Sequence, residues 1–225
     1  MVGLKGRPHS LPVQFLTNRR ASLSCVRSSR PANMTQKLVA CVSAFSDGNR
    51  GIGYKGDLPW PKLQGDEEYY RGICKRTVDP NKKNGIIVGR LTWESGGAES
   101  REERPKEATI VISRSLSKDT RGCVAVVSTL SEAIDRFMSG PGSEEIENIY
   151  VLGGTLPYQD AIQDKRCSRL YLTRVYQDFP CDATFPAFEH SFHRVTDSGV
   201  DDCVREDNGV KYRFEVWERN VSGAS

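Results

Sequence analysis

The feature that most constrains this chain is a series of short, continuous apolar runs that recur along its length. Runs of this kind cover residues 38–42, 85–89, 108–112, 124–127, 149–152 and 170–173. Continuous apolar runs, unlike alternating ones, are typical of strands that are covered on both faces, as in a parallel sheet. Segments with helical patterns lie between them. The sequence therefore predicts an α/β fold with a mostly parallel sheet.

Helix and edge-strand signals complete this pattern. A capping box, Thr129-Leu130-Ser131-Glu132, opens a predicted helix that runs to about residue 138. Further helices are expected over residues 65–75 and from Thr155 onward. Two alternating segments, around 192–197 and 211–218, predict an antiparallel edge at the C-terminal end of the sheet. We expect these elements to form one domain.

The first 33 residues differ in composition from the rest of the chain. They are rich in Arg and Ser, all of their charged residues are basic, and they lack the apolar stretch of a secretory signal. This composition favours a mitochondrial transit peptide. The alternatives are a disordered tail, or an upstream extension of a protein that starts at Met34 and stays cytoplasmic.

Charge and cysteine usage exclude several classes of function. Without the basic leader, the chain has slightly more acidic than basic residues, which argues against a nucleic-acid-binding body. No apolar stretch is long enough for a membrane-spanning helix. The seven cysteines stand singly, at positions 25, 41, 74, 123, 167, 181 and 203. We therefore expect reduced, structural thiols, an intracellular compartment and no metal site.

Glycine and polar residues follow three of the apolar runs, where ligands collect in open α/β sheets. Arg90 follows one run, Ser113-Arg114 a second, and Gly153-Gly154-Thr155 a third. Two glycines before a helix let a phosphate approach backbone N–H groups, although the same pair also occurs in ordinary turns. Two guanidinium groups and a hydroxyl suit a 2′-phosphate and favour NADP(H) over NAD(H). The usual Gly-x-Gly-x-x-Gly fingerprint is absent.

A second concentration of signals is Gly51-Ile52-Gly53-Tyr54-Lys55-Gly56-Asp57-Leu58-Pro59-Trp60-Pro61. Its glycines predict a flexible loop, and Pro-Trp-Pro predicts a stiff turn that holds an indole ring. Asp66, the first acid of the following helix, can face a pocket walled by Trp60 and bind a planar amidine-like edge through paired hydrogen bonds. The alternative is an acid that only complements the helix dipole.

Taken together, these segments resemble the dihydrofolate reductase family, from about Leu38 to Arg219. Further matching segments are Val88-Gly89-Arg90-Leu91-Thr92-Trp93, Tyr150-Val151-Leu152-Gly153-Gly154…Tyr158, Leu172-Thr173-Arg174 and, as in animal enzymes, Gly209-Val210-Lys211-Tyr212-Arg213-Phe214-Glu215-Val216-Trp217. The resemblance implies an eight-stranded sheet within residues 37–220. It also implies reduction of 7,8-dihydrofolate to 5,6,7,8-tetrahydrofolate by NADPH in one-carbon metabolism. We expect a monomer that binds folate and NADPH, without a metal, a membrane or a nucleic-acid partner.

The resemblance also implies roles for individual residues. The implied catalytic residues are Asp66, Trp60 and Leu58, with a water near Trp60 that delivers the proton to N5 of the pterin. Substrate would contact Asp66, Tyr70, Thr173 and Ala40. The implied cofactor residues are Ala40, Ile52, Gly53, Asp57, Arg90, Leu91, Thr92, Ser113, Arg114, Gly153, Gly154, Thr155, Leu156 and Tyr158. A cis peptide would join the two glycines, and residues 51–58 would form a mobile loop over the nicotinamide.

Two positions depart from the family pattern. Glu107 stands at the strand start where the family carries an Arg that binds the substrate's α-carboxylate, and Glu67 replaces an aromatic ring beside the substrate. The nearest bases that can substitute are Arg101, Arg104 and Lys106. We expect weaker binding of the glutamate tail, with the hydride chemistry retained, unless one of these bases takes over.

Other functions remain open. A non-catalytic paralogue that binds NADPH or folate and acts through protein or messenger-RNA contacts would keep the same motifs. A reductase for another pterin-like substrate is a further alternative. The pyrimidine-type reductases of riboflavin synthesis share the fold but lack Pro-Trp followed by an acid such as Asp66.

Overall fold

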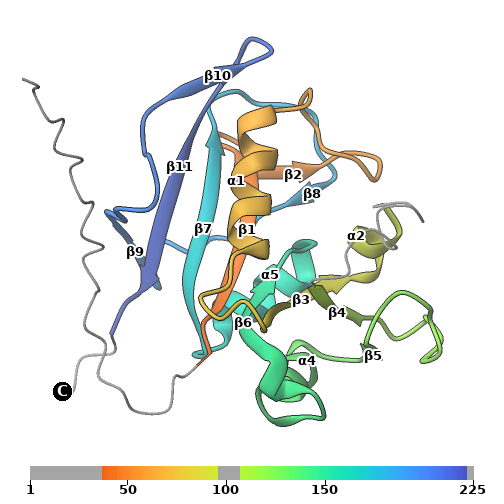
Figure 1. The fold of residues 1–225 in the computed structure, drawn as a ribbon. Coiled ribbons are helices and arrows are strands. Elements are labelled where there is room, and N and C mark those ends of the chain that lie inside the picture. The colour runs from red at the N-terminus through yellow and green to blue at the C-terminus, as the bar shows by residue number, and fades with distance from the viewer. Residues whose placement is uncertain (1–36, 96–106, 222–225) are drawn as a thin grey trace, which may run out of the picture. The chain divides into compact units, whose positions relative to one another are not determined.

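The computed structural model describes residues 37–95 and 107–221, which form a large main sheet with helices on both faces (Figure 1). The leader, Met34, Cys25, Arg101, Arg104 and Lys106 lie outside the described residues. The strands are β1 (Val39–Ser46), β2 (Gly51–Gly53), β3 (Lys83–Gly89), β4 (Glu107–Ile112), β5 (Ala125–Val127), β6 (Ile146–Val151), β7 (Cys167–Val175), β8 (Ala183–Thr184), β9 (Phe192–Val195), β10 (Arg205–Asp207) and β11 (Val210–Arg219). The helices are α1 (Gln64–Lys75), α2 (Arg90–Ser95), α4 (Leu130–Ser139), α5 (Thr155–Gln163) and the short 3₁₀ helix η1 (Ser143–Glu145).

The sheet has the predicted mixed topology. Eight strands follow the order β10-β11-β7-β1-β6-β3-β4-β5, and β9 pairs with β11 beside this path. All neighbours from β7 to β5 are parallel, whereas β11 is antiparallel to β7, β9 and β10. The predicted α/β class, the eight-stranded sheet and the antiparallel C-terminal edge are therefore confirmed.

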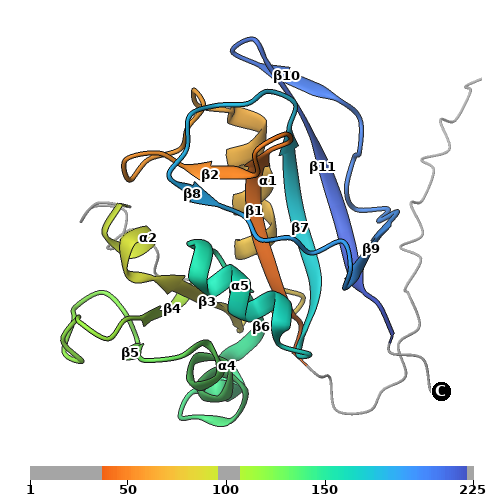
Figure 2. The ribbon, with the colours of Figure 1, turned by 180° about the vertical axis from the view of Figure 1, so that it is seen from behind.

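The helices cover the sheet because each presents an apolar face. Helix α1 lies in front of the sheet in Figure 1, and α4 and α5 lie on the opposite face in Figure 2. One face of α4 is buried in the same core cluster as apolar side chains of the central strands; its residues there are Leu130, Ala133, Ile134 and Phe137. Thr129 caps this helix, because its hydroxyl accepts a hydrogen bond from the N–H of Glu132 at 3.2 Å.

Several short elements were not predicted. Helix α2 begins at Arg90, directly after β3, so this residue starts a helix instead of ending a strand. Strands β2 and β8 form a separate two-stranded ladder, and β10 forms a hairpin with β11. These segments are only two to six residues long, too short for a recognisable hydrophobic period.

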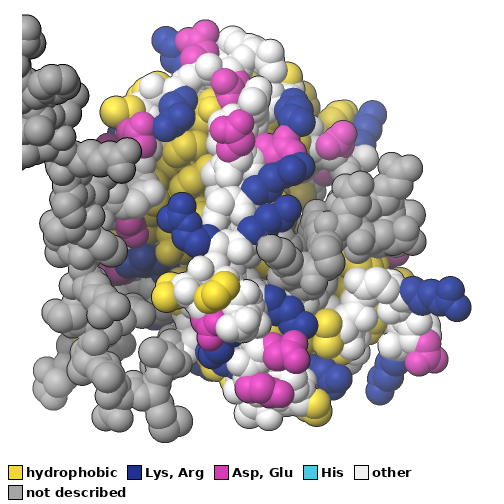
Figure 3. Space-filling view, in the orientation of Figure 1, with side chains coloured by type: hydrophobic (Ala, Val, Ile, Leu, Met, Phe, Trp, Pro, Cys, Tyr) yellow, Lys and Arg dark blue, Asp and Glu magenta, His cyan; other side chains and the backbone are white. Residues whose placement is uncertain are grey.

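The described residues include six of the seven cysteines. None of these six forms a disulfide with another described residue, and three of them are buried. The same residues contain no group of His, Cys, Asp and Glu side chains arranged to hold a metal ion. No helix in these ranges has the length and apolar character needed to cross a membrane. On the described part of the face that carries α1, acidic and basic side chains are interspersed (Figure 3).

Candidate active site

A large cavity opens at the carboxyl ends of the parallel strands. Its volume is about 1720 Å³, whereas a site for one small ligand usually measures about 300–1,000 Å³. The walls come from the segments that follow β3, β4, β5 and β6, from the loop after β1, and from α1 and β7. The cavity can therefore hold two ligands side by side, and its two halves are built differently.

Backbone atoms form one half, which we call the cofactor half. The ends of β3 and β6 touch, because the N–H of Gly89 donates to the carbonyl oxygen of Gly153 at 2.6 Å. Gly153 and Gly154 are joined by a cis peptide bond, as the resemblance implied. A Cβ on Gly153 would lie 2.9 Å from the ring of Tyr158, so only glycine fits there. Helix α5 starts immediately afterwards at Thr155, and Gly154, Thr155 and Leu156 line the cavity. The first N–H groups of a helix have no acceptor within the helix.

Polar and charged side chains surround this helix start. Arg90 and Arg114 both line the cavity, and Arg90 forms an ion pair with Glu94 at 2.6 Å. The hydroxyl of Ser113 is held at the turn after β4, where it accepts the N–H of Leu116 at 3.0 Å. These groups, with the helix dipole of α5, make this half attractive to phosphate groups.

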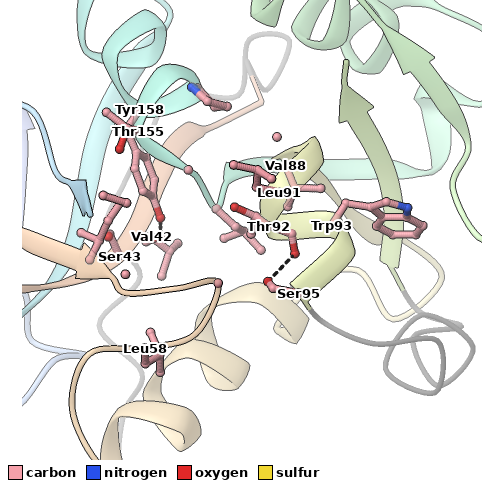
Figure 4. A pocket seen from close by; sticks show the side chains of 18 of the residues that line it. Val42, Ser43, Leu58, Val88, Leu91, Thr92, Trp93, Ser95, Thr155 and Tyr158 are labelled. Atoms are coloured by element: carbon pink, nitrogen blue, oxygen red, sulfur yellow. Dashed lines mark hydrogen bonds between the residues drawn. The ribbon is translucent and has the colours of Figure 1, made fainter. Parts of the chain in front are cut away.

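Figure 4 shows how side chains from α2, α5 and β1 surround the cavity. The Tyr158 hydroxyl points toward β1 and donates to the carbonyl oxygen of Val42 at 2.7 Å. The Thr155 hydroxyl donates to the carbonyl oxygen of Thr184 at 3.0 Å, which ties the start of α5 to β8. These two hydrogen bonds join the first turns of α5 to β1 and β8.

A half-buried carboxylate defines the other half, which we call the substrate half. Asp66 lies in the first turn of α1 and lines the cavity. Burial raises the pKa of Asp66 to about 6, and the nearby charge of Glu67 acts in the same direction. A hydrogen bond with Thr173, which is 1% exposed on β7, opposes this rise in pKa. Asp66 therefore exchanges a proton close to neutral pH.

Trp60 forms the wall beside this carboxylate. Its indole is 4% exposed and packs edge-on against Phe179, with ring centroids 6.1 Å apart. The indole N–H is buried but has no hydrogen-bond partner among residues 37–95 and 107–221. A buried donor of this kind is normally satisfied, so its place at the cavity wall is suited to a water molecule or a ligand atom.

Glu67 carries the second acid of this half. It lines the cavity one residue after Asp66, and its carboxylate binds Lys62 at 2.6 Å and also Arg71. These two cations lower the pKa of Glu67. The two neighbouring acids therefore differ: two cations lower the pKa of Glu67, whereas desolvation raises the pKa of Asp66.

Most of the predicted site residues meet in this cavity. Those that line it are Ile52, Gly53, Asp57, Leu58, Trp60, Asp66, Tyr70, Arg90, Leu91, Thr92, Ser113, Arg114, Gly154, Thr155, Leu156, Tyr158 and Thr173. Gly153 lies beneath the lining and contributes its backbone. The alternative for Asp66, a residue that only complements the helix dipole, does not account for its place in the cavity.

The structure corrects one prediction. Ala40 is 0% exposed and packs in the core between β1 and its neighbours, so it does not reach the cavity. Strand β1 is eight residues long and meets the cavity further on, at residues 42–44. The apolar run in the sequence ends at Val42, which placed the carboxyl end of the strand too early. Counting residues back from the motif that begins at Gly51, instead of forward along the apolar run, would have placed the cavity-lining residues of β1 later in the strand.

Comparison with known proteins decides the family. The family model described as dihydrofolate reductase matches residues 38–219. The chain belongs to the dihydrofolate reductase family. It is 36% identical over 173 residues to the dihydrofolate reductase of Aedes albopictus, covering 76% of this chain and 92% of that protein. The bovine dihydrofolate reductase is 32% identical over 182 residues, covering 80% of this chain and 96% of that protein.

A solved structure agrees with this assignment. The dihydrofolate reductase of Schistosoma mansoni superimposes with a TM-score of 0.70 and 28% sequence identity, covering 82% of this chain and 99% of that one. The expected family and the oxidoreductase class are confirmed. Members of the dihydrofolate reductase family reduce 7,8-dihydrofolate to 5,6,7,8-tetrahydrofolate with NADPH.

Proposed function

We propose that this cavity reduces 7,8-dihydrofolate with NADPH, each molecule occupying one half. The observation that carries the proposal is the pairing of two chemically distinct halves in one cavity. The carboxylate of Asp66 lines one half, and the helix start that follows Gly153 and Gly154 lines the other. The volume of about 1720 Å³ suits two ligands better than one.

The cofactor half fits NADPH. The close approach of Gly89 to Gly153 and Gly154 leaves backbone where side chains would otherwise stand. The N–H groups at the start of α5 would bind the pyrophosphate, and Arg90 with Arg114 would bind the 2′-phosphate. When bound, NADPH supplies the hydride. The remaining cofactor contacts that we propose come from Ile52, Gly53, Asp57, Leu91, Thr92, Ser113, Thr155, Leu156 and Tyr158.

Asp66 would orient the pterin and favour its protonated form. Its two carboxylate oxygens can accept hydrogen bonds from N3 and the 2-amino group, a planar pair of donors. Burial raises the pKa of Asp66 to about 6, so the group is mostly ionised at neutral pH, and its charge would stabilise a proton on the pterin. The indole N–H of Trp60 would hold a water that delivers the proton to N5.

Two further groups would close and shape the substrate half. Leu58 is 52% exposed on the loop before Trp60, where it can cover the reacting rings when the loop closes. Tyr70 lines the cavity one turn after Asp66, and its ring would pack along the substrate. We also propose that the enzyme acts as a monomer, because one chain supplies both halves of the site.

The test of this proposal is turnover of dihydrofolate by the full chain and by Asp66→Asn. We expect this variant to bind NADPH normally but to lose roughly 100- to 10,000-fold in turnover at neutral pH, as expected when a positioned acid is lost. Glu67→Gln is the matched control, because it neutralises the adjacent acid at the rim; we expect it to stay within about 5-fold of the wild type. Full activity in Asp66→Asn, together with loss of activity in Glu67→Gln, would refute the role assigned to Asp66.

A non-catalytic NADPH- or folate-binding role is the second candidate. Glu67 favours it, because a charged side chain replaces the apolar surface expected beside the substrate. The same assay separates the two functions. Tight NADPH binding without any dihydrofolate-dependent oxidation of NADPH would favour the non-catalytic role, and oxidation with a different pterin alone would favour another reductase.

For residues 1–33 we propose a mitochondrial targeting role, supported by their Arg-rich, acid-free composition. A fluorescent protein fused behind residues 1–33 should enter mitochondria, whereas a fusion that starts at Met34 should remain in the cytosol. The same cytosolic distribution for both fusions would favour a disordered tail.

A further inference from the structure

The helix that carries Asp66 is not capped by its own sequence. Leu63 occupies the N-cap position of α1, and its apolar side chain cannot accept a hydrogen bond. The acceptor comes instead from the β10–β11 hairpin, 142 residues away in sequence. Oδ2 of Asp207 accepts the N–H of Gly65 at 2.9 Å, and Gly65 directly precedes Asp66. Figures 1 and 2 place the hairpin and the start of α1 at the same end of the sheet.

A second side chain of the hairpin orients this carboxylate. The hydroxyl of Tyr212 donates to Oδ2 of Asp207 at 2.6 Å, and Tyr212 is itself 1% exposed. The hydrogen bonds from Tyr212 and from the backbone N–H of Gly65 lower the pKa of Asp207, so it is ionised at neutral pH. A charged acceptor at the first turn complements the dipole of α1.

The packing leaves no freedom at the contact. A Cβ on Gly65 would overlap the hydroxyl oxygen of Tyr212, so a side chain at Gly65 would push α1 away from the hairpin. At the tip, the side-chain amide of Asn208 donates to the carbonyl oxygen of Lys62 at 2.7 Å. The hairpin therefore makes hydrogen bonds with the backbone on both sides of Leu63, in the segment between Trp60 and Asp66.

We propose that Asp207 and Tyr212 are positioning residues that hold the carboxylate of Asp66 in its reactive place. This inference rests on the proposed role of Asp66. Neither residue lines the cavity, so both act through the backbone of Gly65. A shift of about 1 Å at a reacting group can cost roughly 100-fold in rate, which gives such a distant contact a measurable effect.

The surroundings of Asp66 predict how its proton affinity would respond. The groups that act on it are Glu67 from its own helix and Thr173 from β7. The hydroxyls of Tyr69 on α1 and Tyr212 on β11 also face it, and the pKa values of both tyrosines are raised, so both are neutral. Release of the helix start would admit water and remove part of the burial. The pKa of Asp66 should then fall toward that of a solvated carboxyl group.

The first experiment compares Asp207→Ala with two matched variants in the full chain. We expect Asp207→Ala to lower the rate of a single turnover by about 10- to 100-fold, with NADPH affinity unchanged. Asp207→Asn should stay within about 5-fold, because its amide oxygen can still accept the N–H of Gly65. Glu206→Ala removes the same charge from the preceding position of β10, whose side chain points to the opposite face, and should leave the rate unchanged.

Two measurements distinguish positioning from general damage. The pH midpoint of the single-turnover rate should move to lower pH in Asp207→Ala but not in Glu206→Ala. In an Asp66→Asn background, Asp207→Ala should change the rate by less than about 2-fold, since residues that act as one unit are not additive. If Asp207→Ala fails to fold, Tyr212→Phe tests the same contact, with an expected loss of about 3- to 10-fold.

The outcomes separate this inference from the proposed function. An unchanged rate in Asp207→Ala or Tyr212→Phe, with Asp66→Asn inactive, would refute the positioning role and leave the proposed function intact. An equal loss in the wild-type and Asp66→Asn backgrounds would also refute it, because the effect would not pass through Asp66. Full activity in Asp66→Asn alone would refute the proposed function instead.

Discussion

The cofactor half and the substrate half of the cavity solve different problems with different parts of the chain. The cofactor half is made of backbone at the ends of parallel strands, where Gly89 touches Gly153 and α5 begins. The substrate half depends on one side chain, Asp66, which hydrogen-bonds with Thr173 of β7. The preceding residue, Gly65, donates its N–H to Asp207, 142 residues away in sequence. The short segments of the cofactor half are recognisable in the sequence one by one, whereas the support of the carboxylate is visible only in the tertiary structure.

The two halves also differ in electrostatics. Arg90 and Arg114 stand at the open rim of the cofactor half, where the solvent screens them and each acts independently. In the substrate half, burial raises the pKa of Asp66 to about 6, and the groups that contact this carboxylate also shift its pKa. Substitutions at Asp66 and at the groups that contact it should therefore be strongly coupled.

The largest expected effect in the cofactor half is a change of cofactor preference. Replacing Arg90 or Arg114 by Ala should each weaken NADPH binding by about 10- to 150-fold and leave NADH almost unaffected, because only NADPH carries the 2′-phosphate. Together the substitutions should largely remove the preference. Arg136→Ala, on the exposed side of α4, is the matched control. An unchanged NADPH-to-NADH ratio in the double variant would show that other groups bind the phosphate.

A smaller effect is expected at the outer end of the substrate half. Glu107 begins β4, where the family pattern has an Arg for the substrate's α-carboxylate. Replacing dihydrofolate by dihydropteroate, which lacks the glutamate, should therefore lower kcat/KM by less than about 5-fold. Glu107→Arg should restore a loss of about 10-fold or more on the same truncation, the typical value of an Arg–carboxylate contact. A large loss in the unmodified protein would show that another base binds the tail.

The smallest effect concerns stability, and the two acids of the α1 start should behave in opposite ways. Because burial raises the pKa of Asp66 from 3.8 to about 6, its charged form opposes folding at neutral pH. Asp66→Asn should unfold with a free energy on the order of 1–3 kcal/mol higher at pH 7.5, and this gain should disappear as the pH falls through 6 toward 4. Asp207, whose pKa is lowered, should show the reverse: Asp207→Asn should lose stability at pH 7.5 and regain it in acid. Urea unfolding of both variants across this pH range checks the prediction; parallel curves would contradict it.

How much could be predicted from the sequence differs between the two halves for the same reason. The strands of the parallel sheet are buried on both faces, so their runs, such as residues 85–89 and 108–112, are visible without a structure. The residues that follow these runs lie at the carboxyl ends of the strands, where ligands bind. This is why Arg90, Ser113 and Gly153-Gly154 could be identified. Ala40 failed because β1 continues for four residues beyond the end of its apolar run.

The substrate half was predicted only where a motif or the family pattern reached it. Asp66 and Trp60 follow a recognisable turn, but from this stretch alone the carboxylate could equally complement the helix dipole. Its contact with Thr173, the missing cap at Leu63 and the replacement of that cap by Asp207 are long-range features. No local pattern marks Asp207 as the partner of Gly65, because the pairing exists only after the β10–β11 hairpin has docked against α1.

The most direct test of this account is a measurement of the pKa of Asp66 in the folded protein. The carboxyl ¹³C resonances can be followed by NMR over pH 3 to 9 in the full chain, with Asp66→Asn to assign the signal. We predict a midpoint near 6, because burial outweighs the hydrogen bond with Thr173. A midpoint near 4, the value of a solvated aspartate, would contradict the central claim that the substrate half works through a carboxyl group whose pKa is raised by desolvation.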